Sequence, residues 1–148
     1  MTVLDVGCGP GFFTIGIAKL LKGSGKVIAA DLQKGMLDKV RLKIKSTETE
    51  KMITLHKCDT DKIGITEKVD FIFAFWMVHE VPDKGIFFAE LKSILKPEGK
   101  ALIIEPKFHV SKKEFDEMIS TLKTMGFEIK KGPKVFFSRA IVLNLKKD

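Results

Sequence analysis

Short apolar runs alternate with segments of helical period along most of the chain. Strand-like runs lie at residues 2–6, 26–31, 52–58, 69–75 and 99–105, and helical periodicity lies at 11–22, 34–45, 83–95 and 111–124. A short continuous apolar run between turn signals is typical of a buried strand, whereas apolar residues three and four apart indicate an amphipathic helix. Strands that alternate with helices in this way predict a parallel sheet with helices on both faces.

The alternation ends near residue 126. Residues 127–130 and 135–145 are both strand-like, and only Lys-Gly-Pro-Lys separates them. A link this short holds no crossover helix, so the two strands are expected to pair antiparallel. The segment 95–100 is predicted to be a helix stop and a turn, because Pro97 cannot extend a helix and Gly99 resets the backbone. The pattern thus predicts a parallel sheet that ends in an antiparallel hairpin.

Composition narrows the class of protein. The chain has 148 residues, of which 45% are hydrophobic and 30% charged, as expected for one globular domain. Cys8 and Cys58 have no CxxC spacing and no paired histidines, so we predict neither a disulfide framework nor a metal site. We predict that the protein is located in a reducing cytoplasm. The chain opens directly on a strand and its apolar runs are short, so we expect no signal peptide and no membrane span.

Basic residues give the chain a net charge of +7, with lysines concentrated at 107–113, 123–134 and 146–147. A basic face can bind nucleic acid or acidic lipid. The excess is nevertheless spread along the sequence, and aromatic residues do not interleave a basic stripe. We therefore interpret these lysines as solvated surface, and we do not favour a nucleic-acid partner.

The most informative motif follows the first strand. Asp5 ends the strand, Gly7, Gly9 and Gly11 form a turn, and residues 12–21 continue as a helix. Such a turn directs backbone N–H groups at polar or anionic parts of a ligand. A dinucleotide fingerprint requires G-x-G-x-x-G, which this spacing lacks, and Asp5 would repel a pyrophosphate. The motif favours a ligand that carries a cation, although a turn used only for packing is the alternative.

The sequence D-x-G-x-G-x-G resembles motif I of the class I S-adenosylmethionine (SAM) methyltransferases. The resemblance extends over essentially the whole chain. It implies one core domain over residues 1–148, with a Rossmann-like, doubly wound α/β fold. The sheet would have seven strands in the order 3-2-1-4-5-7-6. Members of this family usually have helices before the first strand, whereas Met1 here abuts the strand. We therefore expect the site to be covered by a second copy or by substrate, or the natural protein to be longer.

Asp31 ends the second strand twenty residues after Gly11. A carboxylate at this place accepts hydrogen bonds from both ribose hydroxyls in α/β ligand domains, and it can also cap the following helix. The resemblance implies that Asp59 accepts the adenine amine, with backbone N–H support from its neighbour, and that the Phe75 carbonyl binds the methionine ammonium. The predicted cofactor residues are Asp5, Gly7, Cys8, Gly9, Gly11, Asp31, Leu32, Met36, Asp59, Thr60 and Phe75. Leu32 and Met36 would give apolar contacts, and core packing is an equal alternative for Met36.

The segment 70–83, DFIFAFWMVHEVPD, resembles motif IV of quinone-biosynthesis-like small-molecule methyltransferases. It lacks N-P-P-Y and D-P-P-Y, the patterns of enzymes that methylate exocyclic amines of bases. His79 carries an imidazole, which can accept a proton, although a structural histidine is the alternative. Glu105 ends the fifth strand at the same sheet edge and is the second catalytic candidate, to orient substrate or act as a base. Trp76 and Met77 either line the substrate cavity or belong to the core.

These motifs together predict a SAM-dependent methyltransferase that acts on a small molecule and requires no metal. One alternative is a SAM-binding domain with a regulatory and non-catalytic role. Methylation of RNA or protein is another, because of the lysines. An NAD-type dehydrogenase is disfavoured by the glycine spacing and by the C-terminal hairpin.

Overall fold

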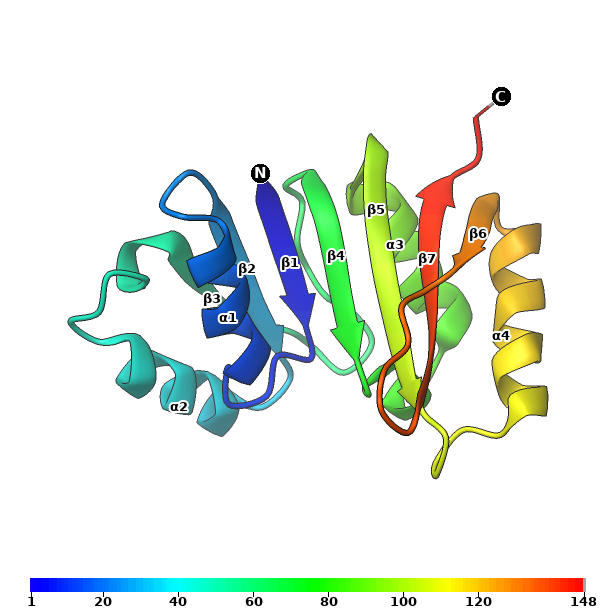
Figure 1. The fold of residues 1–148 in the computed structure, drawn as a ribbon, viewed down its shortest axis with the longest axis horizontal. Helices are drawn as coiled ribbons and strands as arrows, with labels where there is room; N and C mark the ends of the chain where they lie inside the picture. Colours follow the sequence, from blue (N-terminus) through cyan, green and yellow to red (C-terminus); the bar gives the residue numbers. More distant parts are fainter. Residues whose placement is uncertain (148) are drawn as a thin grey trace.

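The computed structural model describes residues 1–147 and contains one seven-stranded sheet in the order β3-β2-β1-β4-β5-β7-β6 (Figure 1). The strands are β1 (Thr2–Val6), β2 (Lys26–Asp31), β3 (Ile53–Lys57), β4 (Val69–Phe75), β5 (Leu95–Pro106), β6 (Phe127–Lys131) and β7 (Ser138–Leu145). Neighbouring strands in the series β3, β2, β1, β4, β5 pair parallel, which gives four parallel pairs. β7 pairs antiparallel with both β5 and β6. The predicted fold class and strand order are confirmed.

The helices are α1 (Phe12–Leu20), α2 (Lys34–Ile44), α3 (Lys84–Ile94) and α4 (Lys112–Thr124). Two of them begin at a side-chain cap, whereas α1 and α2 begin after Gly11 and Gln33 without one. Asp83 accepts a hydrogen bond from Ile86 N and begins α3, and Ser111 forms a capping box with Glu114 at the start of α4. Short 3₁₀ turns, η1 (Glu50–Met52) and η2 (Val78–Glu80), lie before β3 and after β4.

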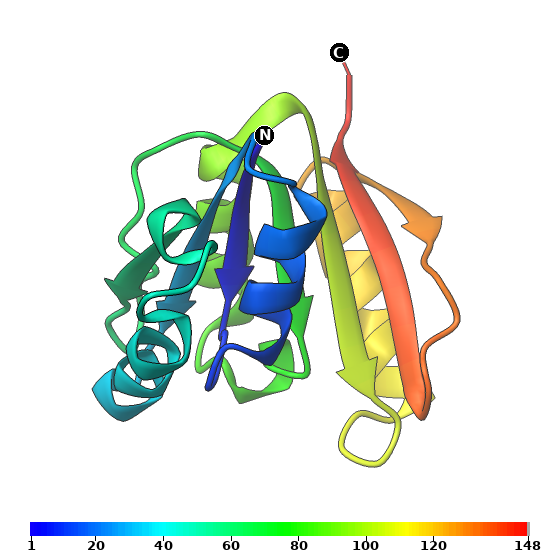
Figure 2. The same cartoon turned by 60° about the vertical axis from the view of Figure 1, so that its left-hand side comes forward.

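Alternating strand residues divide the core into two layers (Figure 2). On β2, Val27 and Ala29 pack with α1 and α2, whereas Ile28 and Ala30 belong to the cluster that contains α3 and α4. Successive side chains of β2 point to opposite faces of the sheet. Because both faces are buried, β2 is an unbroken apolar run. The carboxyl ends of the parallel strands meet at one edge of the sheet, where α/β proteins bind ligands.

Two predicted boundaries were wrong. The turn predicted at 95–100 is part of β5, because Leu95 pairs with Val69 before the pairing shifts to Phe71 and Lys100. Pro97 lies within that irregularity, where its missing N–H costs no ladder bond. The last strand begins at Ser138 rather than at 135, because Ser138 N donates to Val135 O and Phe137 has a φ of 51°. That turn interrupts a sequence with high strand propensity.

No helix within residues 1–147 is long and apolar enough to cross a membrane.

Candidate cofactor and acceptor site

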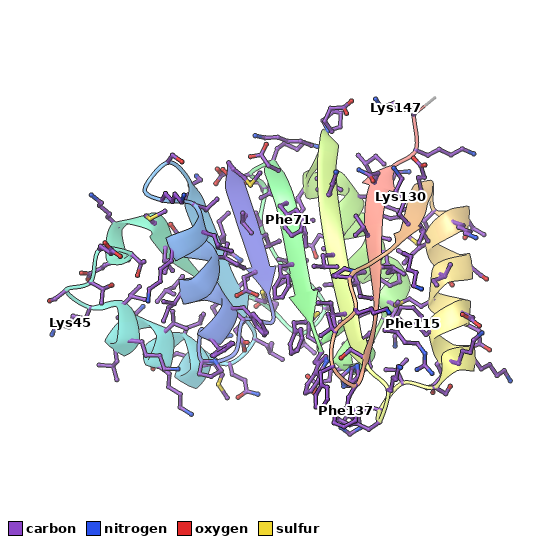
Figure 3. The ribbon with its side chains drawn as sticks, in the orientation of Figure 1. Lys45, Phe71, Phe115, Lys130, Phe137 and Lys147 are labelled. Atoms are coloured by element: carbon purple, nitrogen blue, oxygen red, sulfur yellow. The ribbon has the colours of Figure 1, made fainter. Side chains whose placement is uncertain are left out.

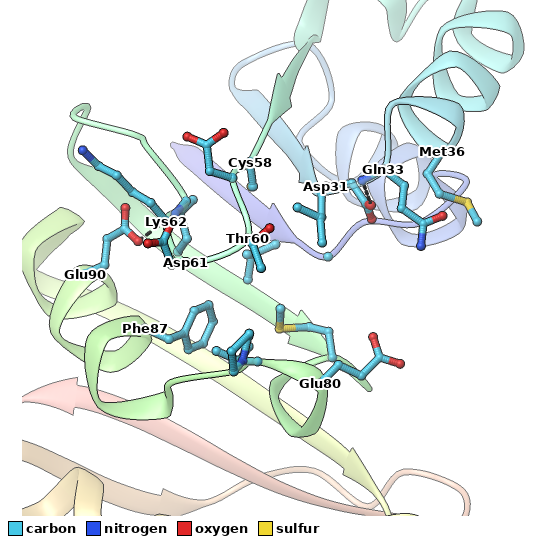
Figure 4. A pocket seen from close by; sticks show the side chains of 18 of the residues that line it. Asp31, Gln33, Met36, Cys58, Thr60, Asp61, Lys62, Glu80, Phe87 and Glu90 are labelled. Carbon is cyan, nitrogen blue, oxygen red and sulfur yellow. Dashed lines mark hydrogen bonds between the residues drawn. The ribbon is translucent and has the colours of Figure 1, made fainter.

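A cavity of about 310 Å³ opens at the carboxyl ends of the parallel strands. It is bounded by the glycine turn after β1, the start of α2, the loop after β3 and the segment after β4. Figure 4 shows Asp31 and Thr60 on one side of this cavity, with Glu80 and Phe87 on the other. Its volume is within the range of small-molecule pockets.

The three glycines of the turn all have positive φ, but each answers a different constraint. A Cβ on Gly7 would lie 2.8 Å from the Met77 side chain, and a Cβ on Gly11 would lie 2.8 Å from Val40 of α2. A Cβ on Gly9 would meet nothing within 4 Å, and Gly9 lines the cavity. Gly7 and Gly11 therefore allow close packing, whereas Gly9 leaves backbone open toward a ligand.

Asp31 connects the turn to the start of α2. Its Oδ2 accepts from Gly9 N at 2.9 Å and its Oδ1 accepts from Gln33 N at 2.8 Å. Each carboxylate oxygen retains acceptor capacity after one such bond. Asp31 is half-buried and lines the cavity, so the same carboxylate fixes the turn and presents free lone pairs.

Asp5 and Cys8 lie beneath the turn and do not line the cavity. The Asp5 carboxylate is 2% exposed and accepts from Thr14 Oγ1 at 2.6 Å. Burial raises the pKa of Asp5 to about 6, partly opposed by the Thr14 hydroxyl, and the charge of Asp31 raises it further. Burial also raises the pKa of the Cys8 thiol to about 12, so this cysteine is no nucleophile.

The loop after β3 contributes Cys58, Asp59 and Thr60 to the cavity. Asp59 N donates to Lys62 O at 2.9 Å, which turns the loop back on itself. Glu90 of α3 accepts from Ile63 N at 2.7 Å and from Gly64 N at 2.8 Å, so it holds the whole loop in place. Sequence reasoning missed Glu90, because no local signal joins it to loop residues that are 26 and 27 positions away.

Of the eleven predicted cofactor residues, the structure brings eight together around this cavity and leaves three outside its lining. The three outside are Asp5, Cys8 and Gly11. The eight that line it are Gly7, Gly9, Asp31, Leu32, Met36, Asp59, Thr60 and Phe75.

Trp76 lines the cavity from the segment after β4 and has an unusual backbone. Its φ is 54°, a costly conformation for a bulky residue. Trp76 Nε1 donates to Ser138 Oγ at 2.8 Å, and the indole stacks on Phe75 at 4.8 Å between ring centroids. These contacts hold the ring at the cavity wall despite the backbone cost.

His79 and Glu105 form a pair at the same sheet edge. Glu105 is 2% exposed, and its Oε2 lies 3.0 Å from His79 Nδ1. The carboxylate also accepts from the backbone N–H groups of Val78 and His79 at 3.1 and 3.0 Å. Burial raises the pKa of Glu105, opposed by the charge and hydrogen bond of His79. The pair leaves His79 Nε2 as the ring nitrogen that can exchange a proton.

His109 is a neighbour that the sequence did not identify. Its ring stacks on His79 at 5.5 Å between centroids with an interplanar angle of 18°. Phe108 contacts both His109 and Trp76, at 4.9 and 5.2 Å between centroids. The loop after β5 thus completes an aromatic wall beside His79. His79, Glu105 and His109 do not line the cavity itself.

The part of the chain that the structure describes contains no group of three or more His, Cys, Asp or Glu side chains that could hold a metal ion. Cys58 lines the cavity, but burial raises the pKa of its thiol to about 11. The Cys58 thiol is therefore a poor nucleophile at neutral pH.

A family model described as "Methyltransferase domain" matches residues 1–139. The demethylmenaquinone methyltransferase of Lactobacillus johnsonii is 35% identical over 103 residues, which are 69% of this chain and 42% of that protein. A ubiquinone/menaquinone biosynthesis C-methyltransferase of Shewanella frigidimarina is 27% identical over 120 residues, which are 78% of this chain and 48% of that protein. This chain spans less than half of the length of these curated relatives.

Among solved structures, a SAM-dependent methyltransferase from Aquifex aeolicus superposes with a TM-score of 0.81 at 30% sequence identity. The match covers 97% of this chain and 80% of that one.

Proposed function

The chain belongs to the class I SAM-dependent methyltransferases, and we propose that it transfers a methyl group from SAM to a small-molecule acceptor. We also propose that residues 1–148 act as one catalytic core domain. The observation that carries the proposal is the Asp31 carboxylate, which lines the cavity beside Gly9 with acceptor capacity to spare.

The chemistry of the cavity fits SAM. Asp31 offers two oxygens to the ribose hydroxyls, and Gly9 gives a ligand access to the backbone. Leu32 and Met36 provide apolar surface for the adenine ring, and Asp59 and Thr60 provide polar groups for its edge. The buried Asp5 and the Phe75 carbonyl would face the positively charged methionine end. Asp5 does not line the cavity, so its negative charge would act on the methionine end through its electric field.

When bound, SAM supplies an electrophilic methyl group on a sulfonium. This chain would contribute alignment of the acceptor and exclusion of water from the reacting atoms. Trp76 would provide a rigid wall for the acceptor, because both its indole N–H and its ring face are engaged.

His79 would remove the proton that the acceptor must lose. Glu105 receives the Nδ1 hydrogen bond and would stabilise the imidazolium that forms, so that Nε2 is the base. Because both Glu105 oxygens are engaged inside the protein, Glu105 is a positioning residue that would act through His79.

The relatives named for quinone biosynthesis support a small organic acceptor. The aromatic wall formed by Phe75, Trp76 and Phe108 also suits a planar apolar molecule better than a hydrophilic one. The location in the cytoplasm stays a prediction.

The test is a calorimetric titration with S-adenosylhomocysteine. We expect micromolar affinity for the unmodified chain and a loss of about a hundredfold in Asp31→Ala, since two charge-assisted hydrogen bonds disappear. Glu80→Ala is the matched control, because Glu80 is an acid at the cavity rim with no predicted ribose contact. Its affinity should change less than about threefold. A folded chain that binds no S-adenosylhomocysteine, or equal losses in both variants, would overturn the proposal.

A further inference from the structure

A second cavity, of about 770 Å³, shares no lining residue with the cofactor cavity and lies between α4, the end of β6, the start of β7 and the loop that joins these two strands. We call it the basic groove. It is lined by six lysines, from Lys107 to Lys134, and by Arg139, against one acid, Asp116. The lysine clusters 107–113 and 123–134, which seemed dispersed in the sequence, are brought together here by the fold.

The groove accounts for nearly all of the net charge of the protein. The chain has 26 basic and 19 acidic residues, of which seven basic and one acidic line the groove. The remaining 19 basic and 18 acidic residues nearly balance. The basic excess that is spread along the sequence is therefore gathered on one surface of the folded chain.

Most of these charges lack an acidic partner. Among the six groove lysines, only Lys112 forms an ion pair with an acid within residues 1–147, at 2.9 Å from Asp116. Arg139 donates to the carbonyl of Val110 at 3.0 Å. Five like charges around one cavity repel one another, and a polyanion in the groove would remove that repulsion.

Exposed aromatic residues lie on the loop that borders the groove. Phe136 is 80% exposed and Phe137 is 60% exposed, with 4.0 Å between their ring centroids. Their neighbours Val135 and Ser138 line the groove. Exposed rings beside a cationic groove are the pattern of proteins that bind single-stranded nucleic acid, with phosphates on the lysines and bases on the rings.

We propose that the basic groove binds single-stranded nucleic acid. The concave shape favours a chain-like polyanion over a bilayer, because a flat anionic surface cannot contact charges on both walls of a groove at once. The proposal does not depend on the cofactor site. Binding of an oligonucleotide and binding of S-adenosylhomocysteine can each fail without the other.

The test is fluorescence anisotropy with a labelled 15-nucleotide oligouridylate at several salt concentrations. If the five unpaired lysines each contact a phosphate, log affinity should fall against log salt with a slope of about −3.5. Lys130→Glu with Lys131→Glu should weaken binding at least thirtyfold and flatten the slope. Phe136→Ala with Phe137→Ala should weaken binding about tenfold and leave the slope unchanged.

The control is Lys45→Glu with Lys51→Glu, which changes the net charge equally at exposed positions outside the groove. Figure 3 shows Lys45 and Lys130 at opposite ends of the molecule. This variant should lose less than about threefold in affinity. Equal losses in the two charge variants, absence of salt-dependent binding, or displacement of the oligonucleotide by anionic but not neutral vesicles would overturn the proposal. Thermal unfolding of each variant establishes that it is folded.

Discussion

The two halves of the sheet differ in what covers them. The half formed by β1, β2 and β3, the covered half, has α1 and α2 packed on one face. The turn after β1 contacts both β2 and α2. In the open half, formed by β5 and β7, Leu102 and Val142 face the same side and are only half-buried. Figure 2 shows that, within residues 1–147, no helix lies over these two strands on that side.

The halves also differ in how they position functional groups. In the covered half, the backbone N–H groups of the glycine turn are anchored to the end of β2, since Gly7 N and Cys8 N donate to Ala30 O and Gly9 N donates to the Asp31 carboxylate. In the open half, single side chains do it, with Glu105 holding His79 and Ser138 holding Trp76. A rigid cofactor pocket thus adjoins an acceptor wall whose order depends on a few long-range side-chain contacts.

Glu105→Ala is expected to have the largest effect, because it removes the acceptor of two buried backbone N–H groups and of the His79 ring. The free energy of unfolding should fall by about 4 kcal/mol, since each unsatisfied buried donor costs about 1–3 kcal/mol. Chemical denaturation measures this loss. Glu105→Gln retains one acceptor oxygen and should lose less.

Glu98→Ala is the matched control on the same strand. Glu98 pairs with Lys147 at 3.2 Å and both side chains are exposed, so its loss should stay within about 0.5 kcal/mol. If Glu105→Ala is as mild as Glu98→Ala, the open half does not depend on the buried carboxylate and the comparison between the halves fails.

The second prediction separates packing from ligand access within the covered half. Gly11→Ala should destabilise the fold by about 3 kcal/mol, because φ is 91° and the new Cβ would lie 2.8 Å from Val40. Gly9→Ala should cost only about 1 kcal/mol of stability. It should weaken S-adenosylhomocysteine binding about tenfold, because the methyl group occupies open space at the cavity. Denaturation and calorimetry on both variants would refute this division if Gly11→Ala lost affinity and Gly9→Ala lost stability.

The covered half could be predicted from the sequence because its signals are local. Asp5, the three glycines and Asp31 are placed by strand ends and turn chemistry within about thirty residues, and the structure brings Gly7, Gly9 and Asp31 to one cavity. The strand order required the family resemblance, since apolar periodicity alone does not say which parallel strands are neighbours.

The open half could be predicted only in part. His79 and Glu105 were both proposed, but their contact joins residues 26 apart, and the bond from Trp76 to Ser138 joins residues 62 apart. No local pattern indicates that His109 would stack on His79. The basic groove was missed for the same reason, because a cationic surface built from one helix, a hairpin and a loop exists only after the chain has folded.

The third prediction concerns Asp5, whose charge belongs to the covered half although its side chain does not line the cavity. Its folded-state pKa of about 6 lies above the ordinary value of 3.8, so the folded state binds the proton more tightly than the unfolded state. The stability that this group contributes is full below about pH 3.8 and is lost as pH rises through about 6. At pH 7 the buried carboxylate is ionised at the expense of stability.

The shift of about two in the pKa of Asp5 corresponds to about 3 kcal/mol of stability at pH 7. Asp5→Asn should recover only about 2 kcal/mol of this, because the new amide N–H groups are buried. The difference in unfolding free energy between the two proteins should appear between about pH 4 and pH 6 and vanish at pH 3.5. Asp38→Asn should give no gain in stability, because Asp38 is exposed and Lys34 lowers the pKa of its carboxyl.

If Asp5 is retained for the field it applies to a cationic ligand, Asp5→Asn should also bind S-adenosylhomocysteine more weakly. A variant that is more stable and binds equally well would show that the charge of Asp5 has no role at the site.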